Sequence, residues 1–319
     1  MRYILYNSES ELAAFILQGG VGEGTELIGY PEMPATVLGR IGRGVESLLP
    51  RTRLALYPDP RVGRQLRRIT PADTVLFFAI ENTRNIANLA KYIATRDMHV
   101  FLWNPIARLK GDAAGSVRQL ARIKRLVRSI HTFDGRDAAR YGLRLVPQPY
   151  RKVAPPPTGT QARCDFYFSG VDKGRLAILL ELKAAIGDLG MRPSFHIVGD
   201  RHRAYTPQEQ AHLAQDWIAY ADNVRRSQQA GCLVEIVQEH QSGPTLRSVE
   251  ALFLRRKIVT NRPSAREDAF FDPHRVLVIG DRVDRDALRH FMAQPFDPPR
   301  PALLAPHDIR TWLDNLLAA

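Results

Sequence analysis

A short polar loop in the second half of the chain, 169-SGVDKGR-175, has residue types that can bind a phosphate group. Gly170 and Gly174 allow a ligand to approach the backbone closely, and Lys173 and Arg175 supply positive charge. Hydrogen bonds from such cations to phosphate are stronger than those between neutral groups. The spacing matches neither the P-loop nor the dinucleotide-binding glycine pattern, so an ordinary strand-to-helix turn with a surface lysine and arginine is the alternative.

A second polar stretch, 238-QEHQSGPTLRSVE-250, leads from a loop into a predicted helix. The N–H groups of a helix's first turn have no partners within the helix, so the amides of Thr245 and Leu246 can bind an anion. Glu250 lies about one and a half turns further along, where it can reach the ribose hydroxyls of a nucleotide whose phosphates contact those amides. A core carboxylate that pairs with an arginine such as Arg247 is the alternative.

Alternating strands and helices must position these two stretches. Short apolar runs predict strands at residues 3–6, 26–30, 53–57, 74–80, 99–103, 164–170, 194–200, 233–238, 257–261 and 275–281. Helices are predicted at residues 8–18, 82–95, 114–129, 175–187, 244–254 and 308–319, and a long helix is predicted to begin at the capping box Thr206–Glu209. This alternation indicates parallel sheets with helices on both faces.

A proline-rich segment divides the chain. Pro147, Pro149 and the triple proline at 155–157 cannot continue a helix or a central strand, so this segment is the predicted linker. We therefore predict domains at residues 1–155 and 156–300, followed by a closing helix at 301–319. The predicted fold is α/β, with two doubly wound, Rossmann-like domains that face each other across a cleft.

The composition is that of a soluble globular protein large enough for two cores. The chain has 319 residues, of which 45% are hydrophobic and 24% are charged. No apolar run approaches the roughly 20 residues of a membrane span, and the N-terminal stretch does not have the pattern of a signal peptide. Cys164 and Cys232 lie far apart, which suggests neither a metal site nor a disulfide framework and fits a reducing cytoplasm.

Positive charge is concentrated in the first half. Residues 1–155 contain 24 Lys/Arg against 13 Asp/Glu, whereas the remainder contains 21 against 20. This asymmetry indicates that the first half faces an anionic partner, such as nucleic acid, anionic lipid or a phosphate-bearing substrate. A generally arginine-rich composition without a selected partner is the alternative.

The helix predicted over residues 114–129 has two stripes, one apolar and one basic. The apolar stripe consists of Val117, Leu120, Ile123 and Val127, and the basic stripe consists of Arg118, Arg122 and Arg125. An ordinary solvated face is the alternative interpretation of the basic stripe.

Residues 239–261, EHQSGPTLRSVEALFLRRKIVTN, resemble the donor-binding element of GT-B glycosyltransferases, in which a glycine-rich turn starts a helix that bears a ribose-binding glutamate. The sequence is more similar still to a bacterial group of lipopolysaccharide and capsule glycosyltransferases. That similarity rests on Gly170–Arg175, Val234–Asn261, Phe271–Gly280, Trp103–Pro105 and Thr132–Tyr150.

The resemblance implies transfer of a sugar from a nucleotide-sugar donor to a cell-surface glycan or lipid-linked acceptor. It implies that residues 1–155 bind the acceptor, that residues 156–300 bind the donor, and that no metal or other cofactor is needed. The implied donor-binding residues are Gly170, Asp172, Lys173, Gly174, Arg175, Gln238, Glu239, His240, Gln241, Gly243, Thr245, Leu246, Arg247 and Glu250.

The sequence departs from the GT-B pattern at two positions. A second glutamate is expected eight residues before Glu250, but this position is Ser242, so contact with the donor sugar falls to residues 238–241. The group's Asn-Asn pair is Asn261-Arg262 here. The motif Asp284–Asp286 has the pattern of the metal-binding GT-A motif, but it lies too late in the chain for that role.

An inverting enzyme also needs a base near the acceptor hydroxyl. Asp59, Glu81 and His131 are the candidates, at predicted strand ends of the first domain. A GT-B-shaped sugar-nucleotide epimerase is the alternative enzyme. A nucleic-acid-binding protein is disfavoured because no recognised module appears. The expected location is the cytoplasm, with peripheral attachment of the basic half to the anionic inner membrane.

Overall fold

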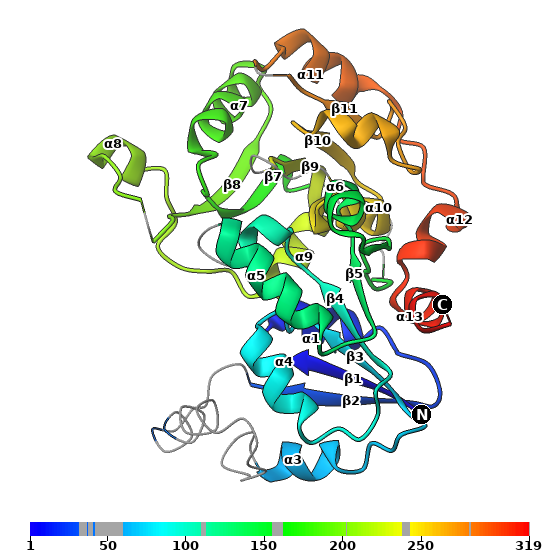
Figure 1. The fold of residues 1–319 in the computed structure, drawn as a ribbon. Helices are drawn as coiled ribbons and strands as arrows, with labels where there is room; N and C mark the ends of the chain where they lie inside the picture. Colours follow the sequence, from blue (N-terminus) through cyan, green and yellow to red (C-terminus); the bar gives the residue numbers. More distant parts are fainter. Residues whose placement is uncertain are drawn as a thin grey trace. The chain divides into compact units, whose positions relative to one another are not determined.

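The structure is a computed structural model that describes residues 1–31, 37, 41, 60–109, 113–154, 162–201, 203–237, 243–280 and 282–318. The chain forms two compact units, one of Met1–Pro147 with Trp312–Ala319 and one of Gln148–Thr311 (Figure 1). The chain thus enters the second unit at Gln148, whereas the sequence predicts a boundary at residues 155 and 156. It returns to the first unit at Trp312, within the predicted closing segment.

The first unit contains a sheet of six parallel strands in the order β2-β1-β3-β4-β5-β6. The strands are β1 (Arg2–Asn7), β2 (Thr25–Tyr30), β3 (Thr74–Phe78), β4 (Met98–Leu102), β5 (Ser129–Thr132) and β6 (Arg144–Leu145). The helices are α1 (Glu11–Leu17), α3 (Pro60–Leu66), α4 (Thr83–Ala90), α5 (Ala113–Lys124) and α6 (Gly135–Tyr141), with a 3-10 helix, η1 (Ile106–Arg108). All five residues of β4 are buried, as expected for a central strand of a parallel sheet with both faces covered.

The apolar runs predict β1 to β4 correctly, whereas β5 and β6 are not predicted. The predicted strand at residues 53–57 lies outside the described residues. In α5, Leu120 and Ile123 are buried as predicted, but Val117 is 43% exposed and does not belong to the apolar face. Arg125, predicted to lie on the helix, follows its last turn.

The C-terminal helix α13 (Ile309–Leu317) completes the core of the first unit. Trp312 packs edge-on against Phe101, with ring centroids 4.9 Å apart, and against Phe78 at 6.0 Å. Its Nε1 donates a hydrogen bond to the Pro147 carbonyl at 2.6 Å. The closing helix is therefore a structural part of the unit that begins at Met1.

The second unit contains five parallel strands in the order β11-β10-β9-β7-β8. The strands are β7 (Cys164–Val171), β8 (Pro193–Val198), β9 (Ala230–Glu235), β10 (Lys257–Thr260) and β11 (Val276–Val278). The helices are α7 (Leu176–Asp188), α8 (Pro207–Gln210), α9 (Tyr220–Gln228), α10 (Leu246–Leu254), α11 (Arg285–Ala293) and α12 (Pro301–Leu304), with 3-10 helices η2 (Pro263–Glu267) and η3 (Ala305–His307). The chain order reverses between β7 and β9, and open α/β sheets bind ligands at the carboxyl ends of the strands that flank such a reversal.

The prediction of a long helix that begins at Thr206 is wrong. The capping box itself is present, with hydrogen bonds between Thr206 and Glu209 in both directions. However, α8 ends at Gln210 because the chain turns back to β8, where the Ala214 N–H donates to the Ile197 carbonyl at 2.7 Å. Helix α9 then begins only at Tyr220.

Candidate functional site

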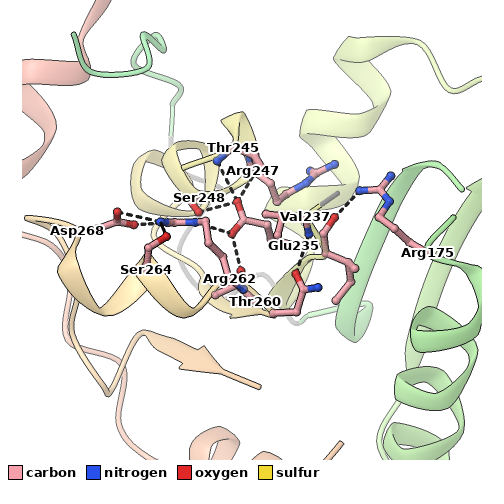
Figure 2. A network of polar contacts seen from close by, with 12 residues as sticks. Arg175, Glu235, Val237, Thr245, Arg247, Ser248, Thr260, Arg262, Ser264 and Asp268 are labelled. Carbon is pink, nitrogen blue, oxygen red and sulfur yellow. Dashed lines mark hydrogen bonds and ion pairs between the residues drawn. The ribbon is translucent and has the colours of Figure 1, made fainter. Parts of the chain in front are cut away.

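The two polar stretches lie at the chain reversal of the second sheet. The first follows β7 and the second follows β9, and β7 and β9 are neighbouring parallel strands. Of the second stretch, the predicted sugar-contact residues Gln238, Glu239, His240 and Gln241 lie outside the described residues. Figure 2 shows the polar contacts at this edge of the sheet.

The turn after β7 has a left-handed backbone at two consecutive residues. Lys173 has a φ of 47° and Gly174 has a φ of 83°. A Cβ at Gly174 would meet nothing within 4 Å, so the backbone angle and not the available space favours glycine there. Lys173 is exposed, and for a non-glycine residue this conformation is strained. Gly170, inside β7, has a normal backbone, and a Cβ there would make ordinary contacts.

Arg175 binds backbone carbonyls and is not a free surface cation. Its Nε donates to the Asp172 carbonyl at 2.9 Å, its Nη1 to the Ile236 carbonyl at 2.5 Å, and its Nη2 to the Val171 carbonyl. The guanidinium lies 5.5 Å from the centre of the Phe168 ring. Burial lowers the pKa of Arg175 to about 10, so it remains charged at neutral pH.

Asp172 is fully buried, and its carboxylate binds three groups of the protein. Its Oδ1 accepts a hydrogen bond from the Leu176 N–H at 2.6 Å, which satisfies one amide at the start of α7. Its Oδ2 accepts from Arg203 Nη1 at 2.7 Å and from the Tyr205 hydroxyl at 2.9 Å. Asp172 therefore fixes the position of the 203–205 segment beside the loop.

Glu235, at the end of β9, places its carboxylate at the N-terminus of α10 and accepts hydrogen bonds there. Its Oε1 accepts from the Thr245 N–H at 3.2 Å, from Ser248 Oγ at 2.7 Å, and from the Thr245 hydroxyl. Its Oε2 accepts from Thr260 Oγ1 at 2.6 Å. The amide of Thr245, predicted to bind an external anion, is therefore already bonded to an internal one, as Figure 2 shows.

The same carboxylate faces a buried arginine that sequence analysis missed. Arg262 is 1% exposed, and its Nε lies 3.8 Å from Glu235 Oε2. Its Nη1 donates to Asp268 at 3.1 Å, and its Nη2 forms an ion pair with the same carboxylate. A charged residue between Val234 and Ile236 in an apolar strand, and the departure from Asn-Asn at residue 262, were the signals for this pair.

Glu250 corresponds to the core carboxylate considered as the alternative. It is 1% exposed, and one of its oxygens forms an ion pair with Arg247. The other oxygen accepts from the Tyr150 hydroxyl at 3.3 Å and from the Tyr220 hydroxyl at 3.4 Å. Burial, followed by the charge of Glu250, raises the pKa of both tyrosines. Burial lowers the pKa of Arg247, but Glu250 and the neighbouring tyrosines together outweigh burial, and the net shift is upward.

The remaining donor-site candidates lie around the start of α10. Gly243 is buried and Leu246 is half-buried. Arg247 also donates to the Ser169 carbonyl at 3.1 Å, at the end of β7, so it joins α10 to the first loop. The structure thus brings the two predicted stretches together, largely through arginines that bind the protein itself.

The base candidates of the first unit have structural partners. Glu81 accepts from the Asn104 N–H and from Asn104 Nδ2, both at 2.7 Å, and also from the Trp103 N–H. It therefore holds the loop that follows β4. Asp59 lies outside the described residues.

His131 lies in the interior of the first unit. It is 1% exposed, and its Nε2 is 2.7 Å from Ser129 Oγ, which is 2.6 Å from Nδ1 of His99. Nε2 of His99 lies 3.2 Å from the carboxylate of Asp97. Burial lowers the pKa of His131 to about 3, so it is neutral at physiological pH and its basicity is weak.

Within the described ranges, no group of three or more His, Cys, Asp or Glu side chains is arranged to hold a metal ion. The pattern at Asp284–Asp286 is a helix start, because Asp284 accepts from the amides of Asp286 and Ala287 at the beginning of α11. No helix among the described residues combines the length and apolar character needed to cross a bilayer.

Comparison by sequence finds no matching family model and no matching curated protein. Comparison by structure finds proteins with the same architecture. A structure titled trehalose-6-phosphate from E. coli, bound with UDP-2-fluoro glucose, is 11% identical with a TM-score of 0.59, covering 100% of this chain and 98% of that one. The UDP-forming trehalose-phosphate synthase of Burkholderia xenovorans is 12% identical with a TM-score of 0.55, covering 99% of each chain. The sucrose-phosphate synthase of Thermosynechococcus elongatus is 11% identical with a TM-score of 0.51, covering 99% of this chain and 94% of that one.

These structures are GT-B glycosyltransferases, and like them this chain has two parallel sheets with helices. The predicted fold class is confirmed: the chain has the GT-B fold, built from two Rossmann-like domains.

Proposed function

We propose that the protein is a glycosyltransferase that moves a sugar from a nucleotide-sugar donor to a cell-surface glycan or lipid-linked acceptor, like the lipopolysaccharide and capsule group that its sequence resembles. The proposal rests on one observation. Arg175, in the loop after β7, donates to the Ile236 carbonyl after β9, at the chain reversal of the second sheet. This is the position at which open α/β sheets bind nucleotides. An exposed lysine, Lys173, stands in the turn that follows β7.

The proposed chemistry uses positive charge to stabilise the leaving diphosphate. Breaking the bond between sugar and diphosphate develops negative charge on the phosphate oxygens, and a cation held in place stabilises that charge in the transition state. Lys173 supplies such a cation, because it lies exposed on a short turn between β7 and α7. One similar structure is bound with UDP-2-fluoro glucose and another is a UDP-forming synthase, which supports this donor class at the level of the fold.

The proposed acceptor side is the basic first half. Arg118, Arg122 and Arg125 are exposed on or just after α5. Anionic lipid attracts such residues with on the order of 1 kcal/mol each, so this face can hold the enzyme at the inner membrane without a membrane span. A lipid-linked acceptor in that membrane would then be concentrated near the enzyme.

The test is nucleotide binding by Lys173→Ala. A thermal-shift screen of UDP-, GDP-, CMP- and dTDP-sugars first identifies the nucleotide, and titration calorimetry then compares the nucleoside diphosphate with the nucleoside. We expect Lys173→Ala to weaken diphosphate binding by tenfold or more and to leave nucleoside binding unchanged, because a charge-assisted hydrogen bond contributes about 1.5–3 kcal/mol.

The matched control is Lys183→Ala, which removes the same charge from α7 of the same unit. Equal losses for nucleoside and diphosphate, or an equal loss in Lys183→Ala, would contradict the proposal. Conversion of the nucleotide sugar into an epimer without any acceptor would instead identify the epimerase.

A further inference from the structure

One peptide group at the end of β9 is held at both of its polar atoms. The carbonyl of Ile236 accepts from Arg175 Nη1 at 2.5 Å. The N–H of the same peptide, that of Val237, donates to Asn261 Oδ1 at 2.7 Å. Figure 2 shows Arg175 and Val237 at this point, beside the network of Glu235.

The two holding side chains come from the strands on either side of β9. Arg175 follows β7 and Asn261 follows β10, and the sheet order here is β10-β9-β7. Because Arg175 also donates to the carbonyls of Val171 and Asp172, its guanidinium joins the loop after β7 to the loop after β9. Three adjacent strands are therefore tied together at their carboxyl ends, where the proposed ligand binds.

From this geometry we infer that Arg175 and Asn261 are positioning residues that fix the Ile236–Val237 peptide, and that Lys173, without Arg175, neutralises the donor phosphates. The second half of this inference rests on the proposed function. All three nitrogens of the Arg175 guanidinium already donate to carbonyls, and its pKa is lowered by burial. Its planar fork suits three carbonyls at once, whereas the single ammonium of a lysine cannot replace it.

This arrangement would prepare the site before a ligand arrives. A peptide fixed in the free protein does not have to be ordered on binding, and preorganised polar groups give more affinity than mobile ones. The positioning role can therefore be measured in the absence of any ligand, which separates it from the proposed function.

The first experiment is amide hydrogen exchange in the ligand-free protein, read at the Val237 N–H or at a short peptide containing it. We expect Asn261→Ala and Arg175→Lys each to speed exchange there by at least tenfold, with no change at β11. Asn261→Asp keeps the acceptor oxygen, so protection should return to near the wild-type level.

Unchanged exchange in Asn261→Ala and Arg175→Lys would overturn the positioning role. Loss of protection throughout the second unit would do so as well, because it would indicate a general stability effect. Melting curves of all three variants check that each is folded.

The second experiment uses inorganic pyrophosphate, which carries phosphate charge without a base or a sugar. We expect Lys173→Ala to lose at least tenfold in affinity and Arg175→Met to lose clearly less, through the loosened peptide alone, since a charge-assisted hydrogen bond to phosphate is lost only in the first variant. An equal loss in Arg175→Met would make Arg175 a phosphate ligand and overturn the inference. If the wild-type protein binds neither pyrophosphate nor any nucleotide, the role of Lys173 and the proposed function fall together, while hydrogen exchange still decides the positioning role.

Discussion

The two units use their carboxylates differently at the carboxyl ends of their strands. In the second unit, Glu235 faces Arg262 and Glu250 pairs with Arg247, and all four side chains are largely buried. In the first unit, Glu81 accepts instead from main-chain N–H groups, such as that of Asn104. Asp134 and Asp137 behave in the same way, accepting from the amides of Arg136 at 2.9 Å and Ile106 at 2.7 Å.

The excess positive charge of residues 1–155 comes from their 24 Lys/Arg against 13 Asp/Glu, and the two units also differ in where their arginines lie. In the second unit, arginines such as Arg247 and Arg262 neutralise carboxylates in the interior, so they contribute little to the field outside. In the first unit, carboxylates such as Glu81 and Asp137 accept from the backbone, and arginines such as Arg118, Arg122 and Arg125 are exposed. Paired charges therefore lie in the interior of the second unit, whereas exposed arginines give the first unit a positive field that attracts anions at long range.

Among the variants that test this contrast, Arg262→Met should have the largest effect on stability. It would leave two buried carboxylates, Glu235 and Asp268, without their arginine, and breaking a buried pair in this way costs about 3–5 kcal/mol. We expect a loss of that size in the free energy of unfolding of the second unit, measured by urea denaturation. The surface variant Arg118→Gln should change it by less than about 0.5 kcal/mol.

A triple variant separates the effect of charge from the effect of packing. Glu235→Gln, Arg262→Met and Asp268→Asn together remove every charge of the network, so the loss should be smaller than for Arg262→Met alone. A triple variant as unstable as the sum of its single changes would show that packing and not charge dominates there.

The next largest effect concerns the exposed arginines of the first unit. Replacing Arg118, Arg122 and Arg125 with Gln should weaken binding to anionic liposomes by about 3 kcal/mol, or roughly a hundredfold, because each contributes on the order of 1 kcal/mol. Sedimentation with anionic vesicles at low salt measures this, and zwitterionic vesicles should bind neither protein.

The matched control removes three exposed arginines from the second unit, namely Arg225, Arg226 and Arg289. Equal losses in the two triple variants would mean that net charge alone matters. Binding that ignores both salt and lipid charge would contradict the membrane role of the first unit.

The smallest effect is a pH dependence from the histidines of the first unit. Burial lowers the pKa of His131 to about 3. Burial also lowers the pKa of His99, although the nearby carboxylate of Asp97 acts to raise it. The unfolded chain binds these protons near pH 6.5, so stability is full above that pH and is lost as the pH falls toward 3. The free energy of unfolding changes by up to about 1.4 kcal/mol per pH unit for each histidine.

Unfolding measured between pH 7.5 and 5 tests this effect. Asp73, whose pKa is lowered to about 2 by the N-terminal amino group, contributes only at more acidic pH and does not interfere. His131→Gln should flatten the slope, whereas the exposed His274→Gln should not. An unchanged slope in His131→Gln would mean that the pKa of this histidine is the same in the folded and the unfolded protein.

The sequence predicts most strands of the fold because buried strands of a parallel sheet are largely apolar. Strand β4 is buried along its whole length and is predicted, whereas β5, with Ser129 and His131 in its four residues, has no such signal. The interruption of the long helix at Gln210 depends on a hydrogen bond to β8, a contact between segments that local pattern cannot anticipate.

The site is predictable in position but not in the partners of each side chain. Lys173 and Arg175 are equivalent cations in the sequence, yet only the structure reveals that Arg175 binds three carbonyls. The sequence likewise identifies Glu250 as an unusual buried carboxylate, but its pairing with Tyr150, a hundred residues earlier, requires the fold.

The return of the chain to the first unit at Trp312 has a consequence for biosynthesis. Residues Gln148–Thr311 are an insertion within the first unit, whose core includes the contact of Trp312 with Phe78 and Phe101. A ribosome therefore completes the whole second unit before it makes Trp312 and the residues after it, which belong to the first unit. Although domains generally fold in order of synthesis, here the inserted unit can finish folding first, and the earlier-made sheet lacks the cover of Phe101 until Trp312 has been made.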